Sequence, residues 1–361
     1  MQIDFHFGVT YILSRLAGFT LKESKIIAHS AQYVDDATNG KTIYFDNGEI
    51  FKPLSSAHRA LDYRNFDNLS DHFVWIPFHF LPGNSMKKFG EITNCNFYER
   101  IKCKPDSYLA KDMIDEVVNQ KNNENSLHRL GITMHVYADT WAHQEFSGIQ
   151  HFSNRVIYLE DDEVSKNLVS KLSNFFKDVF DKKISEFIDD VFPIGHGAVL
   201  TYPDKPYLKW RYKDYSGKLI ERDNPKIFLE AAKNMYKVLK QFRLGDRKAK
   251  VDELNVKDSK KLLSIFEKVT DSNPDERLDK LLKEIEKGNF SFGSEKVSYE
   301  YKGKGSWRYD ALNGLKSKNG KYYKYSERFI KSDWKKVHDA LYEHRHFVLR
   351  KIIPKYDLLI V

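Results

Sequence analysis

One face of a predicted helix at residues 127–148 carries metal-binding side chains, and this feature constrains the fold and the chemistry most. His135, Asp139 and His143 follow one another at intervals of four residues. On a helix with about 3.6 residues per turn, they lie within about 80° of arc. His128, seven residues before His135, returns to nearly the same direction. A solvated face would carry Lys and Glu and a core face Leu and Ile, so this face favours zinc or a similar divalent ion.

The helical rise limits how these side chains can share ions. Residues four apart are separated by about 6 Å along the axis, and residues eight apart by about 12 Å. We therefore expect His135 and His143 to bind different ions, with Asp139 bridging two ions held about 3.5–4 Å apart. A helix with buried, hydrogen-bonded histidines is the alternative interpretation.

Further candidate ligands lie in the first part of the chain, since ten of the 13 histidines precede residue 197. Asp35 and Asp36 end a predicted helix at residues 21–34, where carboxylates oppose the helix dipole. The sequence leaves open which of the two is a ligand, and whether both belong to a solvated turn. His79 stands in an aromatic stretch, residues 74–81. Because Pro77 and Pro82 interrupt a helix, we expect this stretch to form a rigid loop that lines a pocket. A buried core segment is the alternative.

The complete set of predicted metal ligands is His6, Asp35, Asp36, His58, His79, His135, Asp139, His143 and His196. The catalytic candidates among them are Asp139, His143 and His196. His196 lies between two glycines, which allow close approach of the backbone.

The charge balance favours an anionic partner. The 361-residue chain has 59 Lys and Arg against 51 Asp and Glu, a net charge of +8. A phosphate ester, an acidic lipid headgroup or nucleic acid would match this sign, although lysine spread over solvated helices gives the same total. We rank nucleic acid last because no recognition helix, RNA motif or finger is evident.

The N-terminus and the cysteines predict a soluble cytoplasmic protein. Cys95 and Cys103 cannot build a disulfide framework, so we expect reduced thiols. The first residues lack a basic region and a small-residue cleavage site. No run of roughly 18 apolar residues spans a bilayer. The sequence does not predict the oligomeric state.

Helical periodicity predicts a mainly α fold. We expect a His-rich helical core at residues 1–207, a peripheral region of hairpins and charged helices at 208–325, and a C-terminal helix in 326–361 that packs back on the core. Turn chemistry predicts hairpins at 41–51 and 207–222.

The order of these motifs resembles the helical zinc-dependent phospholipase C and P1/S1 nuclease superfamily. The shared order is an N-terminal His, an Asp ending the second helix, a later His, and then HxxxD on a helix. The resemblance implies a trinuclear zinc site that hydrolyses phosphodiesters or phosphomonoesters. By position, the resemblance makes His6 the N-terminal ligand, Asp35 or Asp36 the carboxylate of the first ion, and His58 the next histidine ligand. It makes His135 an ion ligand, Asp139 the bridging carboxylate and His143 the histidine that follows.

Two features depart from that superfamily. Its mature chains begin with a Trp whose free amine is a ligand, whereas Met1 and Gln2 stand here. Its late HxxxE pair is also missing as written, so His196 or His151 would have to replace part of it. The HD phosphohydrolases are a weaker comparison, because the adjacent pair His338-Asp339 is at the wrong end of the chain.

A closer resemblance runs over most of the chain. The segments MQIDFHFGVTY, SAQYVDDAT, PFHFLPG and HVYADTWAHQ look like a bacterial family of unknown function, which implies no activity. We therefore predict a metal-dependent hydrolase of phosphate esters that uses a metal-activated water and two or more Zn²⁺ ions, or Mn²⁺ or Fe²⁺. The alternative is a non-catalytic helical binding or scaffold protein with one structural ion.

Overall fold

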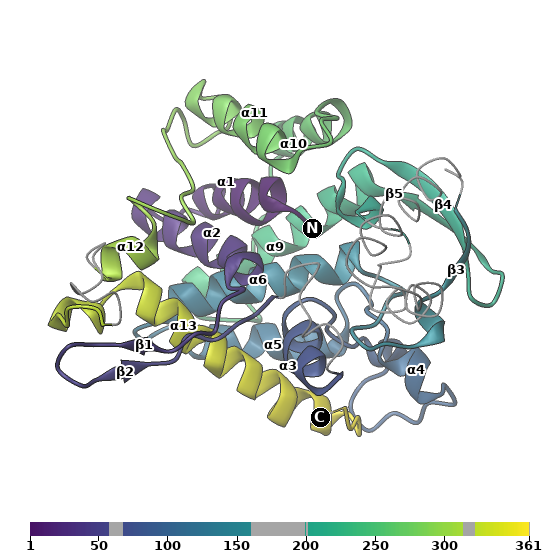
Figure 1. Cartoon of the computed structure of the whole chain (residues 1–361). Helices are drawn as coiled ribbons and strands as arrows, with labels where there is room; N and C mark the ends of the chain where they lie inside the picture. The colour runs from purple at the N-terminus through teal and green to yellow at the C-terminus, as the bar shows by residue number, and fades with distance from the viewer. Residues whose placement is uncertain (58–67, 160–198, 200, 313–321, 361) are drawn as a thin grey trace, which may run out of the picture.

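The computed structural model describes residues 1–57, 68–159, 199, 201–312 and 322–360 (Figure 1). It is mainly helical with two small antiparallel sheets, which confirms the predicted fold class at that level. Within the described residues, no helix combines the length and apolarity needed to cross a bilayer.

Helix α6 (Ser126–Ala142) lies at the centre of the fold (Figure 1). It packs against α2 (Leu21–Asp36), α9 (Asn224–Leu244) and α13 (Asp333–Phe347), so nearly all of its residues are buried. Gly131 allows α2 to approach closely, because a Cβ atom there would lie 2.3 Å from the carbonyl oxygen of Ile27. The predicted C-terminal helix thus packs on the core as α13.

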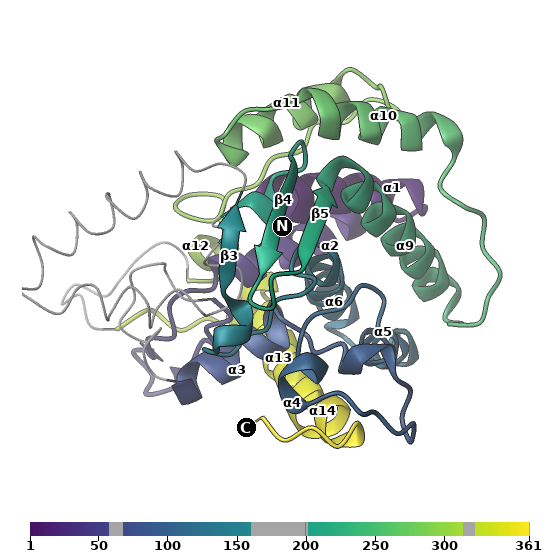
Figure 2. The same ribbon diagram turned by 90° about the vertical axis from the view of Figure 1, so that its right-hand side faces the viewer.

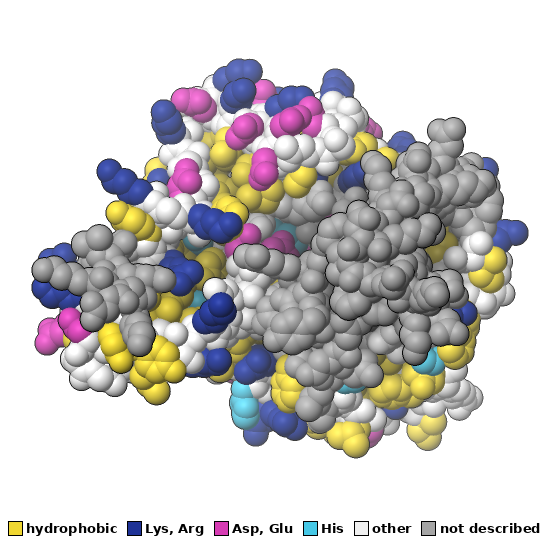
Figure 3. Space-filling view, in the orientation of Figure 1, with side chains coloured by type: hydrophobic (Ala, Val, Ile, Leu, Met, Phe, Trp, Pro, Cys, Tyr) yellow, Lys and Arg dark blue, Asp and Glu magenta, His cyan; other side chains and the backbone are white. Residues whose placement is uncertain are grey.

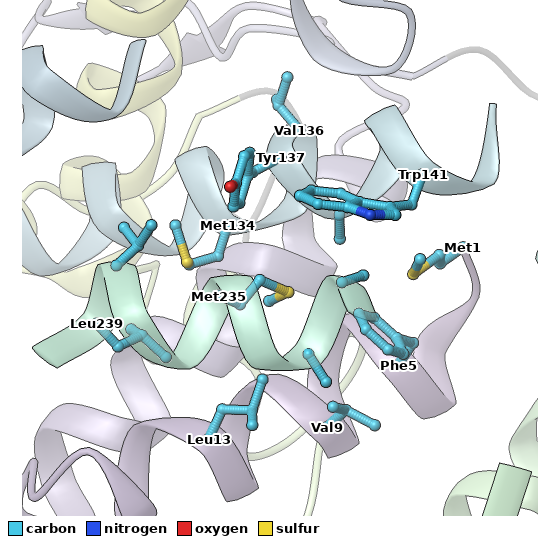
Figure 4. Packing of buried hydrophobic residues seen from close by; sticks show 14 of the residues in the cluster. Met1, Phe5, Val9, Leu13, Met134, Val136, Tyr137, Trp141, Met235 and Leu239 are labelled. Carbon is cyan, nitrogen blue, oxygen red and sulfur yellow. The ribbon is translucent and has the colours of Figure 1, made fainter. Parts of the chain in front are cut away.

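The N-terminal segment is buried against the same core. It forms a π-helical turn, η1 (Asp4–Val9), that continues into α1 (Thr10–Leu16), and every residue of η1 is buried. Figure 4 shows Met1 and Phe5 near Trp141 of α6, where α9 also passes. This apolar packing fixes the position of the first residue.

Helices α10 (Val256–Lys268) and α11 (Pro274–Glu286) cover the outer side of the N-terminal helices (Figures 1 and 2). Arg277 of α11 forms a buried ion pair with Asp4 at 2.6 Å. Its guanidinium also donates to the side chain of Gln2 and to the carbonyl oxygen of Asp271, at 2.7 Å for the latter. The N-terminal segment is therefore held from both sides.

Both predicted hairpins are present. Strands β1 (Ile43–Tyr44) and β2 (Ile50–Phe51) pair antiparallel, and β4 (Lys209–Asp214) pairs with β5 (Leu219–Asp223). Strand β3 (Val156–Leu159) adds to the second hairpin in the order β3-β4-β5 (Figure 2).

The remaining described α-helices are α3 (Asn68–Phe78), α4 (Phe97–Arg100), α5 (Tyr108–Asn119), α12 (Trp307–Ala311) and α14 (Ile353–Lys355). Helix α3 corrects the prediction of a rigid loop over residues 74–81. Pro77 falls in the last turn of α3, where it cannot donate to the carbonyl group of Phe73, and the helix ends one residue later. The carbonyl group of Pro77 accepts a hydrogen bond from Nε2 of His344, at 2.9 Å.

Candidate metal centre

Three elements bring their side chains together around Asp139 of α6. His6 comes from η1, His135 from α6 itself, and His79 follows the end of α3. His6 Nε2 lies 3.3 Å from Asp139 Oδ1, and His79 Nδ1 and His135 Nε2 each lie 3.3 Å from Asp139 Oδ2. The two oxygens of this buried carboxylate therefore face different histidines.

Backbone carbonyl groups fix the tautomers of two of these histidines. His135 Nδ1 lies 2.8 Å from the carbonyl oxygen of Ala31, and His79 Nε2 lies 2.9 Å from that of Ser56. A carbonyl oxygen only accepts, so each of these ring nitrogens carries the proton and donates it. When a ring is neutral, its other nitrogen, His135 Nε2 or His79 Nδ1, presents a lone pair, and these two atoms are 3.3 Å apart.

His6 completes this group without a hydrogen-bond partner. Neither of its ring nitrogens has hydrogen-bond geometry to a described residue, although the side chain is fully buried. Its ring stacks on that of His135 with centroids 3.7 Å apart. An unsatisfied buried imidazole is costly, so its nitrogen facing Asp139 fits a ligand position.

Asp35, at the end of α2, adds a second carboxylate. Its Oδ1 lies 3.9 Å from His79 Nδ1 and 3.8 Å from His135 Nε2, and its side chain is 32% exposed. Two sets of ligand atoms are thus close enough for an ion: His6, His135 and Asp139 form one, and Asp35, His79 and His135 the other.

Asp36 belongs to a different environment. Its carboxylate accepts from the hydroxyl of Tyr299 and, at 3.4 Å, from the amide of Gln32. Asp36 is in neither set of ligand atoms. The structure thus places Asp35, rather than Asp36, beside the histidines.

The α-amino group of Met1 also reaches this centre. It lies 2.6 Å from Asp139 Oδ1 and 3.1 Å from Asp204 Oδ1, and it is fully buried. The predicted ligand set omits both the Met1 amine and Asp204. Asp204 stands next to Pro203 and two residues before Pro206, and this rigid turn is the only sequence signal for it.

His143 lies just beyond α6 and contacts a separate carboxylate. Its Nδ1 donates to the carbonyl oxygen of His79 at 2.8 Å, and its Nε2 lies 3.2 Å from Asp204 Oδ1. Asp139 Oδ2 is 3.7 Å from Nδ1, the nitrogen that donates elsewhere. His143 is in neither set of ligand atoms, so it extends the centre towards Asp204.

Arg222 of β5 holds the end of α6 that presents His143. The Arg222 guanidinium donates to the carbonyl oxygens of Trp141, Ala142 and Gln144 at 3.1, 2.7 and 3.3 Å. These carbonyl groups have no partner within the helix, and a cation there also complements the helix dipole. Burial lowers the pKa of Arg222 to about 10, so it remains charged at neutral pH.

Burial and charge set the protonation states of the centre. Burial lowers the pKa of His6 to about 4, with a further contribution from the Met1 ammonium, and lowers that of His135 well below its usual range. Burial opposes ionisation of Asp139, yet His143 and the Met1 ammonium hold the pKa of its carboxyl well below its usual range. Burial, together with the charge of Asp139, raises the pKa of Asp35 well above its usual range. Neutral imidazoles facing an ionised carboxylate are the state in which these groups bind a metal ion.

Three predicted side chains are not among those placed at the centre, two of them because they are not described. His58 and His196 lie outside the described residues, so their roles stay predictions. His128, on the same helical stripe as His135, pairs with Asp333 at 3.1 Å and lies beside Trp307. It contributes to neither set of ligand atoms.

A cavity of about 550 Å³ adjoins the centre through Asp35. Figure 3 shows acidic and histidine side chains in a hollow on this face, with Lys and Arg side chains nearby. Asp35 thus joins the centre to a cavity large enough for a small molecule.

Residues 1–352 match the model of a family described as a family of unknown function, DUF6765. The chain belongs to this family. The DUF6765 match includes the segments with His6, His79, His135 and Asp139, and it confirms the predicted resemblance to an uncharacterised family. No curated protein and no solved structure matches the chain. The resemblance to the phospholipase C and P1 nuclease superfamily stays a prediction.

Proposed function

We propose that this protein is a metal-dependent hydrolase of phosphate esters. The observation that carries the proposal is the meeting of three acceptors: His135 Nε2, His79 Nδ1 and Asp139 Oδ2 lie 3.3 Å from one another. With both rings donating their protons to carbonyl groups, these atoms repel one another unless a cation lies among them. A divalent ion satisfies all three, and the carbonyl groups that orient the rings resemble the outer-shell partners of known metal sites.

The division of the Asp139 oxygens supports a centre with two or more ions. Oδ1 faces His6 and Oδ2 faces His79 and His135, so the carboxylate is placed to bridge. An ion at Oδ2 would take His79 and His135, with Asp35 near both, which leaves His6 for a second ion at Oδ1. His and Asp ligands favour Zn²⁺, with Mn²⁺ or Fe²⁺ as alternatives.

The chemistry of such ions suits phosphate esters. When bound, they would lower the pKa of a water towards about 7 and offset charge on the phosphoryl oxygens. Burial holds His6 and His135 neutral, Asp139 stays ionised, and Asp35 lies at the cavity through which an ester could enter. His143 and Asp204, paired at 3.2 Å beside the centre, could accept or supply a proton.

Metal content measured by elemental analysis tests this proposal. We expect two or more ions per chain in the wild type and fewer in His135→Gln, with hydrolysis of phenyl phosphate or its methyl ester lost in parallel. His344→Gln is the matched control, because His344 is also buried and donates to a carbonyl group but lies outside the centre. Equal metal in His135→Gln and the wild type would contradict the proposal.

A non-catalytic scaffold is the second candidate, and the Met1 ammonium favours it. This cation already pairs with Asp139 at 2.6 Å and with Asp204 at 3.1 Å. A protein in which the ammonium supplies the positive charge would need one structural ion or none. The ion count separates the two candidates: two or more ions support the hydrolase, and one or none supports the scaffold.

A further inference from the structure

The cavity beside Asp35 carries positive charge on its walls. Lys41, Lys302 and Arg308 line it, together with several Tyr side chains. All three cationic side chains are exposed, and among the described residues none has a carboxylate oxygen within 4.0 Å of its charged nitrogens. Three cations without a carboxylate partner in the described part of the chain thus face one cavity.

The two acidic residues of the cavity are already engaged. Asp36 accepts hydrogen bonds from Tyr299 and Gln32, and Asp35 approaches His79 and His135 within 3.9 Å. Once Asp35 is neutralised by the centre, the positive side chains dominate the cavity. Hydrogen bonds from neutral donors leave the charge of Asp36 in place, but the three cations of the lining outweigh this one carboxylate.

Arg308 packs over a buried aromatic ring, whereas Lys302 lies over the exposed ring of Tyr301, at 4.8 Å. The guanidinium carbon of Arg308 lies 5.8 Å from the centre of the Trp334 ring, and Trp334 is buried. Packing over an aromatic ring orients the guanidinium and leaves the N–H groups at its edge for hydrogen bonds. Two parallel N–H groups match two oxygens of a phosphate.

We propose that this cavity is a binding site for phosphate monoesters, with Arg308 as the main anion contact and Lys302 as the second. This inference rests on the proposed function, because it places the ester next to the candidate metal centre. A monoester carries close to two negative charges at neutral pH, and a diester carries one, so a cavity with three cations favours the monoester. The volume of about 550 Å³ accommodates the organic group as well.

Calorimetric titration with phenyl phosphate tests the site, using both metal-loaded and chelator-treated protein. We expect Arg308→Gln to weaken binding about tenfold or more and Lys302→Gln to weaken it severalfold. Arg328→Gln is the matched control, because Arg328 is exposed on a nearby segment and does not line the cavity. Methyl phenyl phosphate, the diester, should bind more weakly than phenyl phosphate to the wild type, and this preference should shrink in Arg308→Gln.

The outcomes separate this inference from the proposed function. Equal affinities of Arg308→Gln and Arg328→Gln for phenyl phosphate, or no binding by the wild type in either state, would overturn the inference even if the wild type binds metal and hydrolyses esters. Binding that depends on Arg308, without hydrolysis in the presence of any divalent ion, supports the site and contradicts the proposed function. Circular dichroism of each variant checks that the fold is retained.

Discussion

At the scale of single residues, Asp139 contacts two kinds of group, imidazoles and a positively charged ammonium. Three imidazoles within 3.3 Å suit an ion, while the Met1 ammonium at 2.6 Å already balances its charge. From the sequence alone, Asp139 has no cation to pair with in the metal-free protein, and a change to Asn costs little. The buried ammonium overturns that expectation, because it would lose its closest anion.

We therefore predict that Asp139→Asn loses at least one ion and also destabilises the metal-free protein. Breaking a buried ion pair from one side costs about 3–5 kcal/mol, and the remaining contact of the ammonium with Asp204 offsets part of this. Urea unfolding of chelator-treated wild type and variant gives the difference, and elemental analysis gives the ion count. A variant with full metal content would show that Asp139 is not a ligand.

At the scale of elements, the centre depends on how helices end and on what holds the N-terminal turn. Arg222 supports the C-terminal end of α6, and Arg277 of α11 holds Asp4 in η1. Both arginine side chains are buried, and both lie far along the sequence from the candidate ligands that they support. Each acts by placing a backbone segment that carries a candidate ligand.

We predict that Arg222→Met destabilises the fold by about 3 kcal/mol, because the carbonyl groups of Ala142 and Gln144 lose the guanidinium, while that of Trp141 keeps only the side-chain amide of Gln144. Arg222→Lys should recover part of this loss, since it keeps the charge but not the fork of N–H groups. Urea unfolding of the wild type and the two variants gives the order of their free energies of unfolding. If Arg222→Met is as stable as the wild type, the guanidinium does not support α6.

Arg277→Met should destabilise the fold by about 3–5 kcal/mol, because Asp4 would remain buried without a cation. In the double variant Asp4→Asn with Arg277→Met, no unpaired charge remains, so its loss should be smaller than the sum of the two single losses. A double-mutant cycle by urea unfolding measures this coupling. Additive losses would mean that the two side chains do not interact.

At the scale of the whole molecule, buried histidines outside the centre make the fold sensitive to acid. Burial lowers the pKa of His29, His338 and His344 to about 3 in each case. The unfolded chain binds a proton on these groups near pH 6.5, so below that pH the unfolded state takes up more protons. Their contribution to stability is fully present above about pH 6.5 and is lost as the pH falls towards about 3.

The wild type should lose free energy of unfolding between pH 7.5 and pH 5, and we predict that this loss is about 2 kcal/mol smaller in His338→Gln. This is the proton-linkage contribution expected from one histidine that stays neutral in the folded state. Gln can keep hydrogen bonds to Tyr33 and to the amide of Leu54, the two partners of His338. Urea unfolding at several pH values compares the slopes. Parallel slopes for variant and wild type would contradict the prediction.

The sequence by itself determined the mainly helical fold, both hairpins and the central role of the helix with His135 and Asp139. These depend on local spacing: a 3.6-residue period, turn residues between apolar runs, and ligand side chains four residues apart. The long helix could be recognised because its pattern is contained within one element.

Only the tertiary structure decided which side chains meet. The choice of Asp35 over Asp36 depends on the direction in which α2 ends against α6, and the approach of His79 depends on a helix that tolerates Pro77 in its last turn. The Met1 amine reaches Asp139 because Met1 packs in the core beside Trp141 and Arg277 holds the following turn. These contacts join residues up to 273 positions apart, and no local pattern in a single sequence encodes such a distance.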